Sequence, residues 1–194
     1  MRTSRLEAFS DGVLAIVITI MVLELKVPHD ATLSALGGST TSFLTYLLSF
    51  LYIGIYWSNH HHMFQLVEHV HGGVLWANLH LLFWLTLLPF STAWMDETEV
   101  ARTPVVVYGI NLLLAAVAYF VLQLAIFRTP SGERLREALG RDTKGKLSPV
   151  FYLAGIALAF VGPWLAVLVY SLVAAMWLVP DRRVEHYLEA AGER

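Results

Sequence analysis

The feature that most restricts the fold of this chain is a succession of long apolar stretches, separated by short charged segments. The stretches cover residues 6–27, 41–67, 74–95 and 103–127, and a further apolar block covers 149–179. A membrane-spanning helix needs roughly 20 mostly apolar residues, which each of the first four stretches supplies. Only 14% of the 194 residues are charged, against roughly 25% in soluble domains. The sequence therefore predicts an all-α, polytopic membrane protein.

The last apolar block is too long for one ordinary span. Gly162 and Pro163 lie near its middle, and this pair is typical of a turn. We expect two short helices, residues 149–161 and 164–179, that form a helical hairpin. The chain would then be a single domain, residues 1–194, with six transmembrane helices per subunit. Arg2 and Arg5 precede the first stretch as in a signal peptide, but no small-x-small cleavage site follows, so we expect the helix to be retained.

The positions of Lys and Arg predict the orientation, because short cytoplasmic loops are enriched in both. With six spans, only Lys26 and Arg102 lie on one side of the membrane, and the other basic residues share the side that holds both termini. We therefore expect a multi-pass protein of the cell (inner) membrane with both termini cytoplasmic. The residues on that side are Arg2, Arg5, Arg128, Arg134, Arg136, Arg141, Lys144, Lys146, Arg182, Arg183 and Arg194.

Several polar residues fall at one depth near the cytoplasmic ends of the first three stretches, and polar groups inside a bilayer need partners or water. We expect a hydrogen-bonded cluster of Arg5, Asp11, a histidine of the 60–62 run and Asn78. The alternative is that these residues only reach interfacial water. Three consecutive histidines on a helix point about 100° apart and cannot converge on one ion, so we expect no metal site.

The first stretch carries an aliphatic stripe, formed by residues spaced i, i+3, i+4 and i+7. Asp11 lies five residues before the first of them, about 140° round the helix. A pore-lining helix would suit this pattern, but spacing alone favours an ordinary lipid-facing or packed stripe. The stripe consists of Ile16, Thr19, Ile20 and Leu23.

Residues 5–12, R-L-E-A-F-S-D-G, resemble the R-x-x-x-F-S-D signature of the transmembrane protein 175 family, which contains lysosomal potassium channels and bacterial relatives. The pattern Tyr56-Trp57-x-x-His60-His61-x-x-Phe64 is similar to the second helix of that family. Asn78 and the later run at residues 88–90, L-P-F, are also similar. The resemblance covers the first three helices; beyond Thr103 it rests on helix count and the final hairpin.

The resemblance implies the bacterial form of the family, with one six-helix repeat per chain and four identical chains in a homotetramer. It implies a potassium-conducting, cation-selective channel whose pore is lined by the first helix, with a hydrophobic constriction at Ile16, Thr19, Ile20 and Leu23. It also implies a network that holds this helix, made by Arg5, Phe9, Ser10, Asp11, His60, His61 and Asn78. The permeant ion that the resemblance implies is potassium. The expected partners are monovalent cations, the bilayer and the other subunits, and we expect no cofactor and no nucleic acid.

Glu24 follows the stripe at the outer mouth. A ring of carboxylates there would concentrate cations, whereas the alternative role is an interfacial ion pair with Lys26.

Two other classes of function remain to be weighed. A proton-coupled secondary transporter would use Asp11 and the second-helix histidines to carry protons. Against it, the sequence has no matched pair of interrupted helices in two halves. A membrane enzyme is the other class, but neither H-E-x-x-H nor G-x-S-x-G occurs, so we expect no enzymatic activity.

Overall fold

The computed structural model describes residues 2–28, 30–130, 132–139 and 142–178. Within these residues the chain forms helices joined by short connections, which confirms the all-α class. Four of the basic residues that predict the orientation lie outside the described residues, and so does the last residue of the predicted helix 164–179. The four are Arg141, Arg182, Arg183 and Arg194. The helices are α1 (Thr3–Leu23), α2 (Leu33–Gly37), α3 (Thr40–Gln65), α4 (Gly72–Thr86), α5 (Leu88–Glu97), α6 (Arg102–Phe127), α7 (Gly132–Leu139), α8 (Thr143–Leu158) and α9 (Pro163–Leu178).

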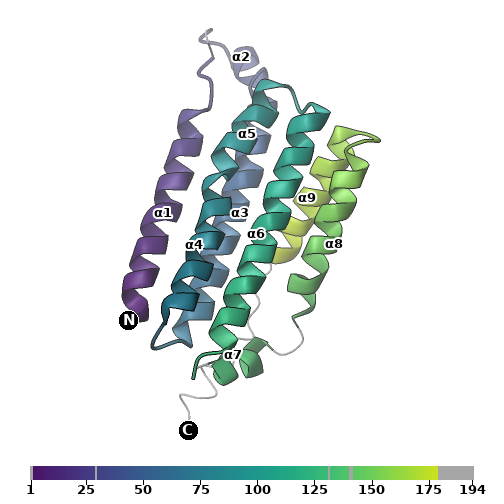
Figure 1. Cartoon of the computed structure of the whole chain (residues 1–194). Coiled ribbons are helices and arrows are strands. Elements are labelled where there is room, and N and C mark those ends of the chain that lie inside the picture. The colour runs from purple at the N-terminus through teal and green to yellow at the C-terminus, as the bar shows by residue number, and fades with distance from the viewer. Residues whose placement is uncertain (1, 29, 131, 140–141, 179–194) are drawn as a thin grey trace.

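The long helices run side by side as a bundle, with α1 at one edge and α8 and α9 at the other (Figure 1). The N-terminus and α7 lie at one end of the bundle, and the short helix α2 lies at the opposite end (Figure 1). Among the described residues, three stretches of helix are long and apolar enough to cross a membrane: α1, the α4–α5 stretch Gly72–Glu97, and α6. The helix α9 is apolar but shorter. This is the composition of a membrane protein.

Two boundaries near the start of the chain differ from the predicted ones. The helix α1 ends at Leu23 rather than residue 27, and Glu24 is its C-cap. The charged and proline residues that follow, Lys26 and Pro28, do not extend the helix. The segment between the first two apolar stretches contains α2, which begins where the Thr32 side chain accepts a hydrogen bond from the Ala35 backbone N–H.

The predicted helix 74–95 is divided into α4 and α5 at Leu87. Pro89 lies in the first turn of α5 and has no backbone N–H to donate to Leu85, four residues earlier. The hydroxyl of Thr92 donates to the Leu88 carbonyl oxygen over 2.7 Å, within the next turn. The two helices nevertheless follow one another as a single rod across the bundle (Figure 1).

The polar segment 128–147, which separates the fourth apolar stretch from the last apolar block, contains α7 and the beginning of α8. The carboxylate of Asp142 accepts a hydrogen bond from the Gly145 backbone N–H over 3.0 Å, and this cap begins α8 at Thr143. The predicted start at Pro149 is six residues later. Pro149 lies in the second turn of α8, where it has no N–H to donate to the Gly145 carbonyl, and the helix continues through it.

Tyr170 of α9 joins four helices in the core. Its ring lies where a Cβ added to Gly109 of α6 or Gly155 of α8 would collide with it. Its backbone carbonyl accepts a hydrogen bond of 2.6 Å from the hydroxyl of Tyr52 in α3. Glycine at the two contact positions therefore lets α6 and α8 approach α9 closely enough to enclose the ring.

A second polar contact lies within the core between α3, α5 and α6. The hydroxyl of Ser49 is 2.6 Å from that of Thr92 and 3.0 Å from that of Tyr108, and all three side chains are buried. These bonds satisfy hydroxyl groups that would otherwise be buried without partners.

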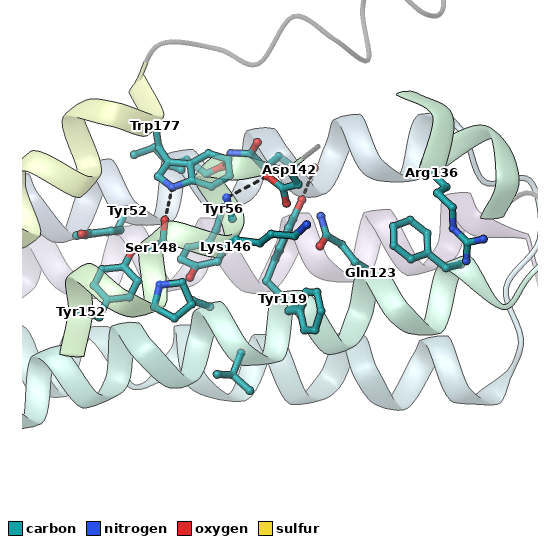
Figure 2. Close-up of a pocket in the computed structure, with 18 residues that line it drawn as sticks. Tyr52, Tyr56, Tyr119, Gln123, Arg136, Asp142, Lys146, Ser148, Tyr152 and Trp177 are labelled. Atoms are coloured by element: carbon teal, nitrogen blue, oxygen red, sulfur yellow. Dashed lines mark hydrogen bonds between the residues drawn. The ribbon is translucent and has the colours of Figure 1, made fainter. Parts of the chain in front are cut away.

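The end of the bundle near α7 encloses a cavity of about 370 Å³. Its walls come from α3, α6, α8 and α9, and residues of α7 and of the start of α8 lie at its rim (Figure 2). No residue of α1 lines the cavity, so it is separate from the site described next.

Candidate pore-lining helix and its polar anchor

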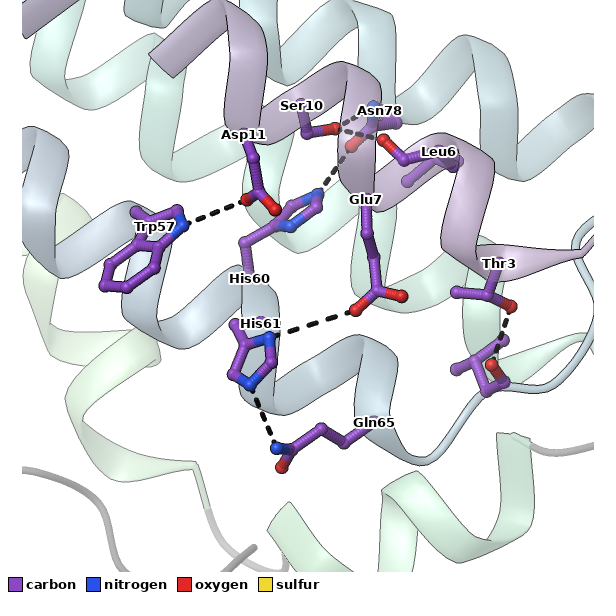
Figure 3. A network of polar contacts seen from close by, with 11 residues as sticks. Thr3, Leu6, Glu7, Ser10, Asp11, Trp57, His60, His61, Gln65 and Asn78 are labelled. Carbon is purple, nitrogen blue, oxygen red and sulfur yellow. Dashed lines mark hydrogen bonds and ion pairs between the residues drawn. The ribbon is translucent and has the colours of Figure 1, made fainter. Parts of the chain in front are cut away.

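A chain of buried hydrogen bonds joins α1 to α4 and α3. The Asn78 side-chain NH₂ donates to the Ser10 hydroxyl oxygen over 3.0 Å, and the Ser10 hydroxyl donates to the Leu6 carbonyl oxygen over 2.9 Å. The other end of the same amide, Asn78 Oδ1, lies 2.8 Å from His60 Nε2 (Figure 3). Since a carbonyl oxygen can only accept, His60 must carry its proton on Nε2. Ser10, His60 and Asn78 are at most 2% exposed, and we call these three residues the polar anchor.

Asp11 is directed to a different partner from the one expected. The Trp57 indole Nε1–H donates to Asp11 Oδ1 over 2.9 Å, and both residues are exposed (Figure 3). Asp11 follows Ser10 by one residue and so lies about 100° round α1 from it. This rotation brings the carboxylate to the outer side of α3 rather than into the polar anchor.

His61 also has a local partner that sequence reasoning missed. Its Nδ1 lies 3.9 Å from a carboxylate oxygen of Glu7, a distance at which the two form an ion pair when the ring is protonated. Its Nε2 lies 3.0 Å from the amide nitrogen of Gln65, one turn along α3. The signal in the sequence was the i, i+4 spacing of Glu7 and Asp11, which aligns both carboxylates with α3.

Within the described part of one subunit, Arg5 lies outside the hydrogen bonds of the polar anchor. It is exposed, and it forms no hydrogen bond or ion pair with any residue that the structure describes. Arg5 is five residues from Ser10, about 140° round the helix, whereas the buried face of α1 passes through Thr3, Leu6 and Ser10. Phe9 is likewise exposed.

Thr3 forms hydrogen bonds between the beginning of α1 and the segment that follows α3. Its hydroxyl donates to the Val67 carbonyl oxygen over 2.6 Å, and its backbone N–H donates to the Glu68 carbonyl oxygen. Together with the polar anchor, this contact fixes the first three turns of α1 against its neighbours.

The aliphatic stripe lies on the exposed side of α1. Ile16 is 59% exposed, Ile20 43% and Leu23 80%, whereas Leu14, Val17 and Met21 are buried on the opposite side. The Thr19 hydroxyl donates to the Ile16 carbonyl oxygen over 2.9 Å, which leaves the hydroxyl oxygen free to accept another bond. An exposed apolar stripe of this length requires a cover of lipid or of other protein copies.

The predicted outer-mouth residue Glu24 is exposed at the end of α1. It lines a groove between α1 and α5 together with Ile16, Ile20 and Glu97. The alternative role of Glu24 was an ion pair with Lys26. In the structure, Lys26 Nζ instead lies 4.0 Å from a carboxylate oxygen of Glu97. Among the described residues no group of three or more His, Asp or Glu side chains is placed to hold a metal ion.

Comparison with known proteins places this arrangement in a family. Residues 5–89, which contain the polar anchor and the stripe, match the family described as endosomal/lysosomal potassium channel TMEM175. A potassium channel of Chryseobacterium sp. (strain P1-3) is 50% identical over 190 residues, which cover 97% of this chain and 99% of that protein. The chain belongs to the TMEM175 family.

A solved structure extends the similarity of this TMEM175 chain to the fold. The crystal structure of a lysosomal potassium-selective channel TMEM175 homologue from Chamaesiphon minutus superposes with a TM-score of 0.77 at 34% sequence identity. The match covers 91% of this chain and 96% of the other. The endosomal/lysosomal proton channel TMEM175 of Bos taurus is 40% identical over 72 residues, only 15% of its length. The TMEM175 likeness therefore includes α6 to α9, which lie beyond the family match.

Proposed function

We propose that this protein is a potassium-conducting, cation-selective channel in which several copies surround a pore lined by α1. Membership of the TMEM175 family and the potassium channel named among its full-length relatives support ion conduction. The observation that carries the pore assignment is the exposed stripe of α1, because its own subunit leaves it uncovered.

The pore would be closed on a hydrophobic constriction. In a homotetramer, four copies of Ile16, with Ile20 and Leu23 further along, would form rings of aliphatic side chains around the axis. A narrow apolar ring resists entry of water and so blocks a hydrated cation, and a small widening restores conduction. Thr19 is the one polar side chain of the stripe, and its free oxygen lone pair would face the permeant potassium.

Charged and polar groups would assist at the two ends of this helix. Glu24, at the outer mouth, would raise the local concentration of cations. At the other end, the polar anchor would hold α1 at the rotation that keeps Ile16 toward the axis. Asp11 with Trp57, and Glu7 with His61, would limit the same rotation from the side of α3.

The proposed topology has six membrane spans: α1, α3, α4 with α5, α6, and a short hairpin of α8 and α9. The 16 residues of α9 reach roughly 24 Å, less than the ~30 Å hydrocarbon core, so the hairpin helices would span a thinned or shielded region. An ion pair of 3.6 Å between Arg134 and Glu68 assigns α7 to the same end as the α3–α4 turn. Most described Lys and Arg residues lie at that end, which supports a cytoplasmic location for both termini.

The direct test is potassium and sodium flux into liposomes that contain the purified protein, compared with an Ile16→Asn variant. Wild-type protein should pass potassium faster than sodium. Ile16→Asn should increase the flux of both ions about tenfold or more, because an amide ring removes the barrier to water in the constriction.

Val22→Asn is the matched control, since Val22 is also an exposed aliphatic residue of α1 but lies about 120° from Ile16. It should leave flux unchanged. Equal effects of the two substitutions would reject the pore assignment. Saturating flux that requires a proton gradient and is lost in Asp11→Asn would instead establish the proton-coupled transporter.

A further inference from the structure

We propose that the cavity near α7 binds one anionic phospholipid of the adjacent leaflet, with an acyl chain inside the cavity and the phosphate at a basic rim. This proposal requires that the bundle lies in a membrane but not that it conducts ions. It concerns the opposite side of the subunit from the stripe of α1, so its outcome is independent of the pore.

The walls of the cavity suit a hydrocarbon chain. They consist mainly of apolar and aromatic side chains from four helices, including Ile55 of α3, Ala116 and Phe127 of α6, and Tyr152 of α8. Val117 and Phe120 also line the cavity, yet both are at least two-fifths exposed on the outer side of α6. The cavity therefore opens sideways, toward the lipid, which gives an acyl chain a route of entry.

The length of the cavity matches one leaflet. Its lining runs along α6 from Ala116 to Phe127, roughly 16 Å at 1.5 Å per residue. Half of a hydrocarbon core of ~30 Å is about 15 Å. The lining reaches the polar segment at the end of the bundle, where a headgroup would be expected, and ends near the middle of α6.

One polar side chain of the cavity lining offers hydrogen-bond donors to a ligand. Gln123 is 5% exposed and lines the cavity, but its side chain has no hydrogen bond to any described residue. Figure 2 shows it among the residues at the rim end, between Tyr119 and Arg136 in the view. The Gln123 side chain can donate through its amide NH₂ group, and an ester or phosphate oxygen of a lipid in the cavity would accept such a bond.

The rim is basic. Arg136 and Lys146 line the opening, and the Arg136 guanidinium lies 5.2 Å from the centre of the Phe127 ring. Lys144 adds a third positive charge, 5.9 Å from the Trp177 ring. The one carboxylate of the lining, Asp142, is occupied by the N-terminus of α8, whose amides and dipole offset its charge. The surplus of positive charge favours an anionic headgroup over a zwitterionic one.

The test is lipid binding to the purified full-length protein in detergent, measured by native mass spectrometry with phosphatidylglycerol and with phosphatidylcholine of the same acyl chains. Wild-type protein should retain one phosphatidylglycerol per subunit in preference to phosphatidylcholine. The double variant Arg136→Gln/Lys146→Gln should bind phosphatidylglycerol about tenfold more weakly, because each basic residue near the headgroup contributes to attraction. Ala116→Phe, which fills the cavity, should weaken both lipids.

Arg134→Gln is the matched control, because Arg134 is an exposed arginine of the same helix that does not line the cavity. It should leave binding unchanged. The melting temperature in lipid-free detergent checks that each variant is folded. If Ala116→Phe does not fold, the rim variants provide the decisive comparison, because their substitutions replace exposed residues. Equal binding of the two lipids, or an equal loss in Arg134→Gln and the double variant, would overturn the assignment.

Discussion

Asn78 lies at the centre of the hydrogen bonds that hold α1 against α3 and α4. Its amide donates to Ser10 and accepts from His60, so it uses both ends within a site that excludes water. An aliphatic residue of similar size can do neither. Loss of the Asn78 amide would leave the buried Ser10 hydroxyl and the buried His60 ring N–H without their partner.

The Asn78→Leu variant should therefore lose about 2 kcal/mol of stability, which is more than the loss of one exposed hydrogen bond. Thermal unfolding of the detergent-solubilised protein measures this effect. Asn59→Ala is the comparison, because the Asn59 side chain only donates to Ile55 within its own helix. A melting temperature of Asn78→Leu equal to that of wild type would show that the polar anchor does not hold α1.

The sequence predicts the depth of these residues better than their partners. Counting residues along three helices brought Asp11, a histidine of the 60–62 run and Asn78 to one level. The structure joins His60 and Asn78 to Ser10, which only the family resemblance had placed in the network. Counting residues could not reveal that Asp11 meets Trp57, since this contact depends on the rotation of α3 about its axis. That rotation is determined by packing of the whole helix, which involves residues far apart in sequence.

At the scale of the elements, the packing of α6, α8 and α9 depends on two glycines that face one ring. Gly109 and Gly155 lie against Tyr170, and a side chain at either position would require the helices to separate. Gly54 of α3 differs, since an added Cβ there would meet no atom of the subunit. The effect of each glycine on the stability of the bundle therefore depends on what packs against it rather than on its helix propensity.

Gly155→Leu should therefore destabilise the protein by about 3 kcal/mol or prevent its folding, as overpacking displaces whole side chains. Gly54→Ala should be neutral, or stabilising by up to ~1 kcal/mol, because alanine favours a helix. The readouts are melting temperature and the yield of monodisperse protein in size-exclusion chromatography. If both variants behave as wild type, α8 can move away from Tyr170 without loss.

Helix boundaries show why elements are only partly predictable from sequence. Apolar runs located α1, α3, α4 with α5, and α6 within a few residues of their observed bounds. The start of α8 was missed because an aspartate cap before a polar first turn leaves no apolar signal. Pro149 was interpreted as the start of the helix because proline is unfavourable in a helix interior, yet α8 continues through it.

At the scale of the whole molecule, the two ends of the bundle differ in charge, and this difference is the basis of the proposed orientation in the membrane. The absence of cysteine from the sequence allows a test without background. Single cysteines would be placed at Ser34 in α2 and at Glu133 in α7, both exposed and at opposite ends of the bundle (Figure 1).

A membrane-impermeant maleimide should label Ser34→Cys in intact spheroplasts. Glu133→Cys should be labelled only after the membrane is permeabilised, because basic ends remain in the cytoplasm. Labelling of Glu133→Cys without permeabilisation would reverse the proposed orientation. It would also place Glu24 on the cytoplasmic side.

The hydrogen bonds that join α1 to its neighbours in the described part of the chain all involve its first nine residues, Thr3 to Asp11. Beyond them the helix is held by apolar contacts alone, over roughly 20 Å from Ser10 to Leu23. A tilt of α1 about the polar anchor therefore displaces the far end of the helix most. A tilt of about 6° at Ser10 would move Leu23 by about 2 Å, so slight rearrangements around His60 and Asn78 would be magnified at the far end of the stripe.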